Sequence, residues 1–347
     1  MDQKSPQAKP LKKPITIKDI AERLKVSVAT VSRALRGSTE IKPETKEAVL
    51  KMAKDLDYHP NLLASSLSSK RSKIIGVVVP TINRFFWSNS ISGIENIAYK
   101  ENYKVMIFQS GESYKKELEI VETLANSRVD GIIIAFSKET TNYDHIESVM
   151  NRGIPVTLFE RVTESIKTCK IVTDDFAGAK EITEHLLARN RRRIVHIGGP
   201  RSLEVCRERL AGYRAALREQ GIAPDPNMEI ELSEFSFDTG GETIERLWRR
   251  LEKPDALFCF ADIIAIGALH AAHNLGISVP EELAIAGFGD DITSKFIRPA
   301  LTTMAQPSFE MGQTAAKMLL HSILENEVQE DCDCISVKPT LMVRDST

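Results

Sequence analysis

Polar, charged and aromatic residues follow the apolar runs of the 347-residue sequence, after positions where strands would end. They are Asn83, Arg84, Phe85, Phe86 and Trp87 after 74–80, Glu160 and Arg161 after the run beginning at 155, Arg207 and Arg209 after 193–199, Asp262 after 256–261, and Asp290 and Asp291 after 283–289. Aromatic faces, carboxylates and an arginine together suit a small polar ligand with a ring, such as a sugar or a nucleobase. A solvated strand end is the simpler interpretation of any single residue, but their recurrence favours a binding site.

The elements that would position these residues alternate between strand and helix from Lys73 onwards. Apolar runs typical of buried strands lie at 74–80, 103–109, 131–136, 155–160, 193–199, 256–261 and 283–289. Helical patterns lie at 88–101, 113–126, 142–151, 176–190, 204–220, 240–251, 262–275 and 308–325. This alternation predicts doubly wound parallel sheets, two of them because the strands are many, with a crossover at 169–175. Since ligands of such sheets bind beyond the carboxyl ends of the strands, we expect a cleft between two lobes.

The stretch 15–37, ITIKDIAERLKVSVATVSRALRG, predicts a different structure, two short amphipathic helices joined by a tight turn. Thr16 and Ser27 are the expected N-caps, Asp19 is placed as a capping-box partner, and Gly37 closes the second helix. A third helix is predicted from Pro43 to about Asp57, which would complete a three-helix DNA-binding module. An ordinary helical hairpin is the alternative, because helix-turn-helix patterns are short and recur by chance.

Charge is distributed unevenly along the chain. Residues 1–72 carry 15 lysines and arginines against 8 acids, a net charge of +7, whereas the remainder carries 31 against 40, a net charge of −9. The first segment alone therefore has the electrostatic footprint of a phosphate-binding module. The outward face of its second helix combines small, hydroxyl and basic side chains, which suits contacts with phosphates and base edges in a major groove. These are Ala29, Thr30, Ser32, Arg33 and Arg36.

Several function classes lack their signatures in this sequence. The segment 198–204 is not a dinucleotide fingerprint, there is no phosphate-binding loop of the Walker type, and the seven histidines show no metal-binding spacing. We therefore expect no enzyme, no cofactor and no metal. No apolar run reaches the roughly 18 to 20 residues of a membrane span, and the basic, proline-rich arm 1–14 has no apolar segment behind it, so a cytoplasmic protein is predicted. The five cysteines are expected to be reduced.

The segments TIKDIAERLKVSVATVSRALRG and, after it, YHPNLLASSL resemble the lac repressor (LacI/GalR) family of bacterial transcription regulators. The resemblance runs from about Ile15 to the C-terminus. It implies a DNA-binding regulator, expected to be a repressor, that binds a palindromic operator as a homodimer. It also implies that a small-molecule effector, a sugar, a sugar phosphate or a similar compound, binds in the cleft between the lobes and controls DNA affinity.

The resemblance assigns roles to individual residues. The DNA-binding positions are Thr16, Ser27, Val28, Ala29, Thr30, Ser32, Arg33, Asn61, Ala64 and Leu67. Val28 and Ala29 match positions that contact bases, while Ala64 and Leu67 match a hinge helix that folds on DNA and inserts a leucine into the minor groove. The effector-binding positions are Phe85, Phe86, Glu160, Arg209, Phe235, Asp262 and Asp290.

Two positions depart from the family pattern. Ala261 stands where the family has asparagine, and Gly289 stands where it often has an acid. Both departures remove groups that would bind sugar hydroxyls. Either the effector is not a plain monosaccharide, or Asp290 takes the place of the missing acid.

The expected architecture is an all-α helix-turn-helix head followed by an α/β core of two doubly wound parallel-sheet lobes, similar to periplasmic binding proteins. The predicted division is a flexible basic arm at 1–14, a DNA-binding domain at 15–60, a hinge at 61–72 and a core at 73–347, with a first lobe of about 73–172 and 304–331 and a second lobe of about 173–303 and 332–347. Two alternatives are a solute-binding protein with the same core and a nucleotide-dependent enzyme. The first would need a signal peptide and no basic head, and the second a phosphate loop.

Overall fold

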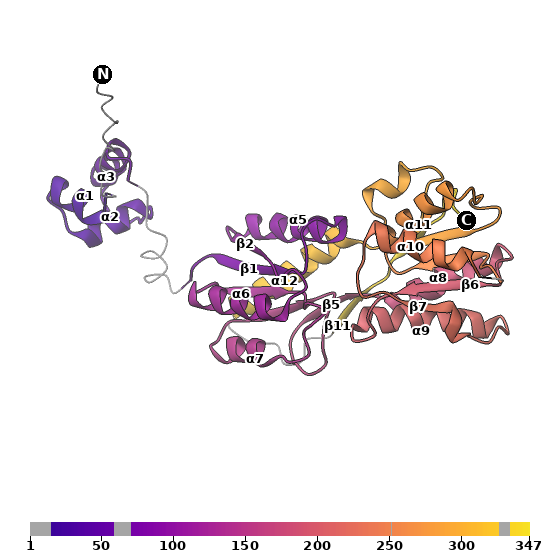
Figure 1. Cartoon of the computed structure of the whole chain (residues 1–347). Helices are drawn as coiled ribbons and strands as arrows, with labels where there is room; N and C mark the ends of the chain where they lie inside the picture. Colours follow the sequence, from indigo (N-terminus) through magenta and orange to yellow (C-terminus); the bar gives the residue numbers. More distant parts are fainter. Residues whose placement is uncertain (1–14, 59–70, 251, 326–333) are drawn as a thin grey trace, which may run out of the picture. The chain divides into compact units, whose positions relative to one another are not determined.

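The computed structural model describes residues 15–58, 71–250, 252–325 and 334–347. The chain divides into two compact units, one ending at Ser72 and the other beginning at Lys73 (Figure 1). We call them the head and the core. Within the described residues, no helix combines the length and apolar character needed to cross a membrane.

In the part of the head that the structure describes, residues 15–58, three helices form a bundle: α1 (Ile17–Leu24), α2 (Val28–Leu35) and α3 (Pro43–Asp55). One apolar side of each helix supplies its small core, formed by Ile20, Ala21, Val31, Ala34, Val49 and Ala53. Both expected N-caps are present. The Asp19 carboxylate accepts hydrogen bonds from the backbone N–H and hydroxyl of Thr16, at 2.6 and 2.7 Å, and the Ser27 hydroxyl accepts one from the Thr30 N–H at 3.0 Å. The turn between α1 and α2 contains Lys25 in the left-handed conformation, with φ of 52°.

The first lobe of the core is a six-stranded sheet in the order β11-β5-β4-β3-β1-β2. Its strands are β1 (Ile74–Val79), β2 (Lys104–Gln109), β3 (Gly131–Ile134), β4 (Val156–Phe159), β5 (Lys170–Thr173) and β11 (Cys334–Val337), and all its pairings are parallel. Helices α5 (Phe85–Lys100) and α12 (Ser308–Glu325) pack on one face. Helices α6 (Tyr114–Asn126) and α7 (Asp144–Asn151) pack on the other (Figure 1).

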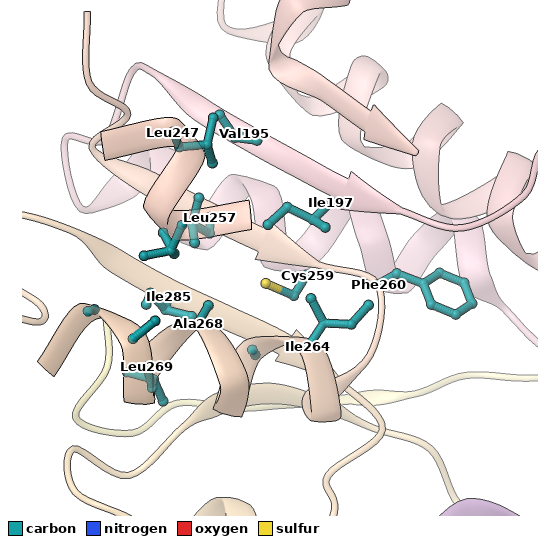
Figure 2. Close-up of a cluster of buried hydrophobic side chains, with 14 of the residues drawn as sticks. Val195, Ile197, Leu247, Leu257, Cys259, Phe260, Ile264, Ala268, Leu269 and Ile285 are labelled. Carbon is teal, nitrogen blue, oxygen red and sulfur yellow. The ribbon is translucent and has the colours of Figure 1, made fainter. Parts of the chain in front are cut away.

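The second lobe also has a six-stranded sheet, in the order β12-β10-β9-β8-β6-β7. It departs from the expected parallel sheet at one edge, where β12 pairs antiparallel with β10, and its other pairings are parallel. Its strands are β6 (Ile194–Gly198), β7 (Glu229–Glu231), β8 (Ala256–Cys259), β9 (Ala284–Phe288), β10 (Thr302–Ala305) and β12 (Thr340–Met342). Helices α10 (Phe237–Trp248) and α11 (Asp262–Asn274) cover one face, and α8 (Asp175–Ala188) and α9 (Glu204–Glu219) cover the other. Figure 2 shows the apolar layer between the sheet and α10 and α11, where Val195 lies beside Leu247 of α10 and Ile285 lies beside Ala268 and Leu269 of α11.

Close helix packing stabilises each lobe, and the pair α5 and α12 shows how. A Cβ added to Gly93 would lie 2.1 Å from the Phe309 carbonyl oxygen, and one added to Gly312 would lie 2.0 Å from that of Ser90. No side chain fits at either contact, so glycine allows the two backbones to approach each other. The helix pair in turn fixes the N-terminal end of α5, which carries Phe85 and Phe86.

The chain passes between the lobes three times, from β5 to α8, from β10 to α12 and from β11 to β12. The first passage lies within the predicted crossover at 169–175. The same segment also contains β5, a strand that was not predicted. The assignment of 332–347 to the second lobe is corrected in part, because β11 pairs with β5 in the first sheet and only β12 joins the second. The expectation of reduced cysteines was also wrong at one position, since Cys169 is disulfide-bonded.

Candidate functional site

The outward face of α2 is exposed and is not needed for the core of the head. Val28 is 42% exposed, and Ala29 and Arg33 are also exposed. Ser27 is exposed as well, whereas Thr30 and Ser32 are half-buried. Together with Thr16, these are the predicted DNA-binding residues of the described head. The other three, Asn61, Ala64 and Leu67, lie outside the described residues.

The hydroxyls of this face already have partners within the head. The Ser27 and Thr30 hydroxyls are 2.8 Å apart and share a hydrogen bond, and the Thr16 hydroxyl donates to Asp19. These residues therefore fix the starts of α1 and α2. Arg33 forms an exposed ion pair with Glu40 at 3.1 Å, which is weak enough to exchange for a phosphate. The surface combines apolar, hydroxyl and cationic groups on one exposed helix, which is the combination used for major-groove contacts.

A cleft with a volume of about 820 Å³ lies between the two lobes of the core. Six of the seven predicted effector residues line it, Phe85, Phe86, Glu160, Arg209, Phe235 and Asp262. They come from the carboxyl ends of strands or the starts of the following helices, as the doubly wound architecture requires. The cleft is large enough for a ligand of one or two rings.

Arg209 is buried on α9 at the base of the cleft. Its guanidinium lies 2.7 Å from the Asp175 carboxylate and donates a hydrogen bond of 2.6 Å to the Phe260 carbonyl oxygen. It also stacks over the Phe288 ring, 3.6 Å from the ring centre. Burial raises the pKa of Asp175, and Arg209 opposes that rise. Arg209 is therefore part of the cleft wall, and its partner Asp175 lies in the interior of the second lobe.

Glu160 directly follows β4 and has a left-handed backbone, φ of 59°, which is uncommon for a residue other than glycine. Its carboxylate accepts hydrogen bonds from the Thr173 hydroxyl at 3.0 Å and from the Gln306 amide at 2.8 Å. Arg209 of the other lobe lies 3.8 Å away. The carboxylate of Glu160 thus lies at the junction of the lobes. Left-handed backbone at residues other than glycine is commonly found at functional sites.

Asp262 begins α11 and is buried in a complete set of hydrogen bonds. Its carboxylate accepts from the Thr303 hydroxyl at 2.6 Å, the Ser294 hydroxyl at 2.9 Å and the Asp291 N–H at 2.7 Å. Burial raises the pKa of this carboxyl to about 6 despite these donors. The side chain thus ties the start of α11 to the ends of neighbouring strands at the cleft floor.

Asp290 does not take the place of the missing acid. Its carboxylate pairs with Arg344 at 2.6 Å, and the cleft is lined at this point by Gly289 and Asp291 instead. The backbone of Asp290 is left-handed, with φ of 49°. Asp290 therefore forms an ion pair outside the cleft lining. Its position at a strand end had predicted that it would line the cleft.

The cleft is also lined by charged and polar side chains to which the family resemblance assigned no role. Arg161 binds Glu112 through two hydrogen bonds of 2.6 and 2.9 Å, and the pair lies on the wall of the first lobe. Arg84 and Gln306 also line the cleft. Arg84 and Arg161 stand in the strand-end segments that the sequence indicated, whereas Glu112 and Gln306 follow β2 and β10 and were missed. Arg207 lies elsewhere and donates to the carbonyls of Arg201 and Ser202.

Cationic side chains of the first lobe reach the second lobe at the rim of the cleft. Arg84 donates a hydrogen bond of 2.8 Å to the Phe235 carbonyl oxygen, and Lys138 donates one of 3.0 Å to that of Ser233. Both acceptors belong to one loop after β7, so these two hydrogen bonds hold that loop of the second lobe against the first lobe. A change in the angle between the lobes would alter both hydrogen bonds. A change at Arg84 would act directly on this contact.

Known proteins show the same two-part organisation. Residues 16–61 match the family described as bacterial regulatory proteins, lacI family, and residues 183–347 match the periplasmic binding protein-like domain. Catabolite control protein A of Priestia megaterium is 30% identical over 334 residues, which cover 96% of this chain and 99% of that protein. The chain belongs to the lacI family of bacterial regulatory proteins. It is a DNA-binding transcriptional regulator.

Solved structures of transcriptional regulators support the same fold. The lac repressor dimer bound to operator and the anti-inducer ONPF has a TM-score of 0.85 and 25% identity, covering 96% of this chain and 99% of that one. The complex of the transcriptional regulator CelR with cellobiose has a TM-score of 0.72 and 26% identity, covering 96% and 100%. The head with two α/β lobes is therefore the lacI-family architecture over nearly the whole chain.

Proposed function

We propose that this regulator is a repressor that binds a palindromic operator as a homodimer, and that a sugar or sugar derivative in the interlobe cleft controls its DNA affinity. The observation that carries the proposal is the cleft of about 820 Å³, lined by aromatic and charged side chains from both lobes. A ligand that contacts both lobes favours one angle between them. Binding of that ligand is then coupled to any property that depends on the angle.

The edge of the first sheet supports self-association. β2 is an edge strand, and Met106 and Ile107 on it are 37% and 47% exposed. Tyr99, near the end of α5, is 74% exposed. An edge strand with exposed apolar residues on both faces favours burial against another molecule, and a second copy would bury it symmetrically. Two heads would then contact two half-sites, which gives the base contacts that one head lacks.

The residues proposed to act on DNA are Thr16, Ser27, Val28, Ala29, Thr30, Ser32 and Arg33 of the head, together with Asn61, Ala64 and Leu67. The role of these last three rests on the family resemblance alone. Because the target is DNA, we expect the protein to act in the cytoplasm, without an enzymatic activity of its own.

Operator binding with and without ligand tests the proposal. Duplexes selected from a random pool by the full-length protein are expected to be palindromic, and halving the palindrome should weaken binding strongly. Addition of a ligand that binds the cleft should change operator affinity by roughly 10- to 100-fold, corresponding to about 1.4 to 2.7 kcal/mol. Linkage requires operator DNA to change ligand affinity by the same factor. A ligand that binds the core without changing operator affinity would contradict the proposal.

Two substitutions of phenylalanine test whether the ligand binds in the cleft. Phe85→Ala removes a half-buried ring from the cleft wall and should weaken ligand binding by roughly 10- to 100-fold, from the apolar area that is lost. Phe296→Ala makes the same chemical change at a ring that is 69% exposed and lies outside the cleft lining. This control should keep the wild-type affinities for ligand and operator. Equal effects of the two changes would place the ligand elsewhere.

A further inference from the structure

Three arginines line the cleft, and one of them differs from the others in its partners. Arg161 is paired with Glu112 at 2.6 Å and Arg209 with Asp175 at 2.7 Å. Arg84 forms no ion pair with the residues that the structure describes, and its recorded hydrogen bond goes to the neutral carbonyl of Phe235 at 2.8 Å. A guanidinium has five N–H donors, so Arg84 keeps donors available for a ligand.

The position of Arg84 on the chain adds to its positive charge. It is the N-cap residue of the 16-residue helix α5, and no side chain caps that end of the helix. The first turn of α5 contains no acidic residue. The N-terminus of a helix attracts anions through its backbone N–H groups and its dipole, so two sources of positive potential coincide on this wall of the cleft.

The carboxylates of the cleft have other partners. Glu112 accepts from Arg161 through both oxygens and from the Lys138 N–H at 2.8 Å. Glu160 accepts from Thr173 and Gln306, and Asp262 has the three donors described above. The fourth carboxylate of the lining, Asp291, accepts from the N–H and the hydroxyl of Thr293 at 3.0 and 2.7 Å. Glu112 is near enough to raise the pKa of Arg84, but burial lowers it more. A partly desolvated guanidinium stays charged and gains most from an anion that brings its own charge.

We propose that the effector carries a carboxylate or a phosphate on a polyol ring, and that Arg84 and the start of α5 bind this anionic group. The Phe235 ring, whose centre lies 5.5 Å from the Arg84 guanidinium, is placed beside the ring of the ligand. Arg84 is then the residue that sets specificity for acidic over neutral ligands. This inference rests on the proposed effector cleft and narrows the class of compound that it binds.

Matched pairs of ligands test the proposal in the full-length protein. Isothermal titration calorimetry would compare glucuronate with glucose, galacturonate with galactose, and glucose 6-phosphate with glucose. At least one acidic member should bind roughly 10- to 100-fold more tightly than its neutral partner, as expected for a charge-assisted hydrogen bond. The uronates and the phosphate distinguish a carboxylate from a phosphate as the recognised group.

Three variants identify the residue responsible. Arg84→Gln should reduce the preference for the acidic ligand to less than about threefold, whereas Arg84→Lys, which keeps the charge, should retain most of it. Arg207→Gln removes an arginine from α9 outside the cleft lining and should leave the preference unchanged. Circular dichroism of each variant checks that the fold is intact.

The outcomes separate this inference from the proposed function. A neutral ligand that binds as tightly as its acidic partner, an acidic preference that survives Arg84→Gln, or a complete failure of the acidic probes to bind would overturn the role of Arg84. If a neutral ligand then binds and shifts operator affinity, the effector cleft stands and only the anionic class is wrong. If an acidic ligand binds through Arg84 and operator affinity does not change, the inference about the ligand stands and the proposed regulation fails.

Discussion

The head and the core present their functional side chains in opposite ways. On α2 the residues proposed to contact DNA, Val28, Ala29 and Arg33, are exposed, and the core of the head is formed by the other side of the helix. In the cleft, Arg209 and Asp262 are buried and hold their surroundings together through ion pairs and hydrogen bonds. Binding and stability are therefore separable in the head and combined in the cleft. Substitutions should show this difference directly.

The largest expected effect is that of Arg209→Ala. It leaves the Asp175 carboxylate buried without its cation, which should lower the free energy of unfolding of the core by about 3 to 5 kcal/mol. Both tryptophans of the sequence, Trp87 and Trp248, belong to the core, so urea unfolding followed by tryptophan fluorescence measures this change. The variant is thus expected to lose stability along with any effect on ligand binding.

Two controls decide whether the lost charge partner is the cause. The double variant Arg209→Met and Asp175→Asn removes both charges and should recover most of the lost stability. Arg218→Ala, at an exposed position of the same helix, should change stability by less than about 0.5 kcal/mol. A single Arg209→Ala variant as stable as the wild type would show that the cleft is no less tolerant than the head.

A smaller effect, and one without a stability cost, is expected for Val28→Ala. The substitution removes two exposed methyl groups, so stability should stay within about 0.5 kcal/mol of the wild type by circular dichroism. If these methyls contact a thymine methyl, operator affinity should fall by roughly tenfold, from about 0.8 kcal/mol for each buried group. The head would then lose recognition while keeping its fold.

Operators in which each thymine is replaced in turn by deoxyuridine identify the contact. One replacement should weaken the wild-type protein and have little further effect on Val28→Ala, because both changes remove the same interaction. Additive losses at every thymine would mean that Val28 does not contact a thymine methyl.

The same difference between the regions explains what the sequence could predict. The N-cap Ser27 and the capping partner Asp19 act within three residues of their contacts, so the local pattern indicated them correctly. The strand-end rule also brought Glu160 and Arg209 to the cleft. The partners that fix these two side chains, Gln306 and Asp175, are 146 and 34 residues away in the sequence, and a local pattern carries no sign of such pairs.

Short strands were missed for a related reason. β10 has the sequence Thr-Thr-Met-Ala and β7 has Glu-Ile-Glu, so neither forms an apolar run. Both are recognisable only through their neighbours in the second sheet, β9 and β6. The orientation of Asp290 depends in the same way on a partner 54 residues away, Arg344. The apolar runs predicted most strands of the two sheets and the edge where the cleft lies. The short strands and the orientation of Asp290 depend on partners distant in the sequence.

The smallest effect concerns pH and the buried carboxyl of Asp262. Burial raises its pKa from 3.8 to about 6, so the folded protein takes up this proton at a higher pH than the unfolded chain does. The folded state therefore gains stability as the pH falls from 7 to 5, by about 1 kcal/mol from this group.

The variant Asp262→Asn cannot take up this proton. Its side chain also has one acceptor oxygen where the carboxylate has two, so the three donors around it have fewer acceptors. The difference in stability between wild type and variant should grow by that amount over this range in urea titrations. Asp238→Asn, on the exposed first turn of α10, controls for the loss of a carboxylate. If the wild type and Asp262→Asn respond to pH with equal slopes, Asp262 is ionised throughout, and the cleft floor tolerates charge as readily as the exposed surface of the head.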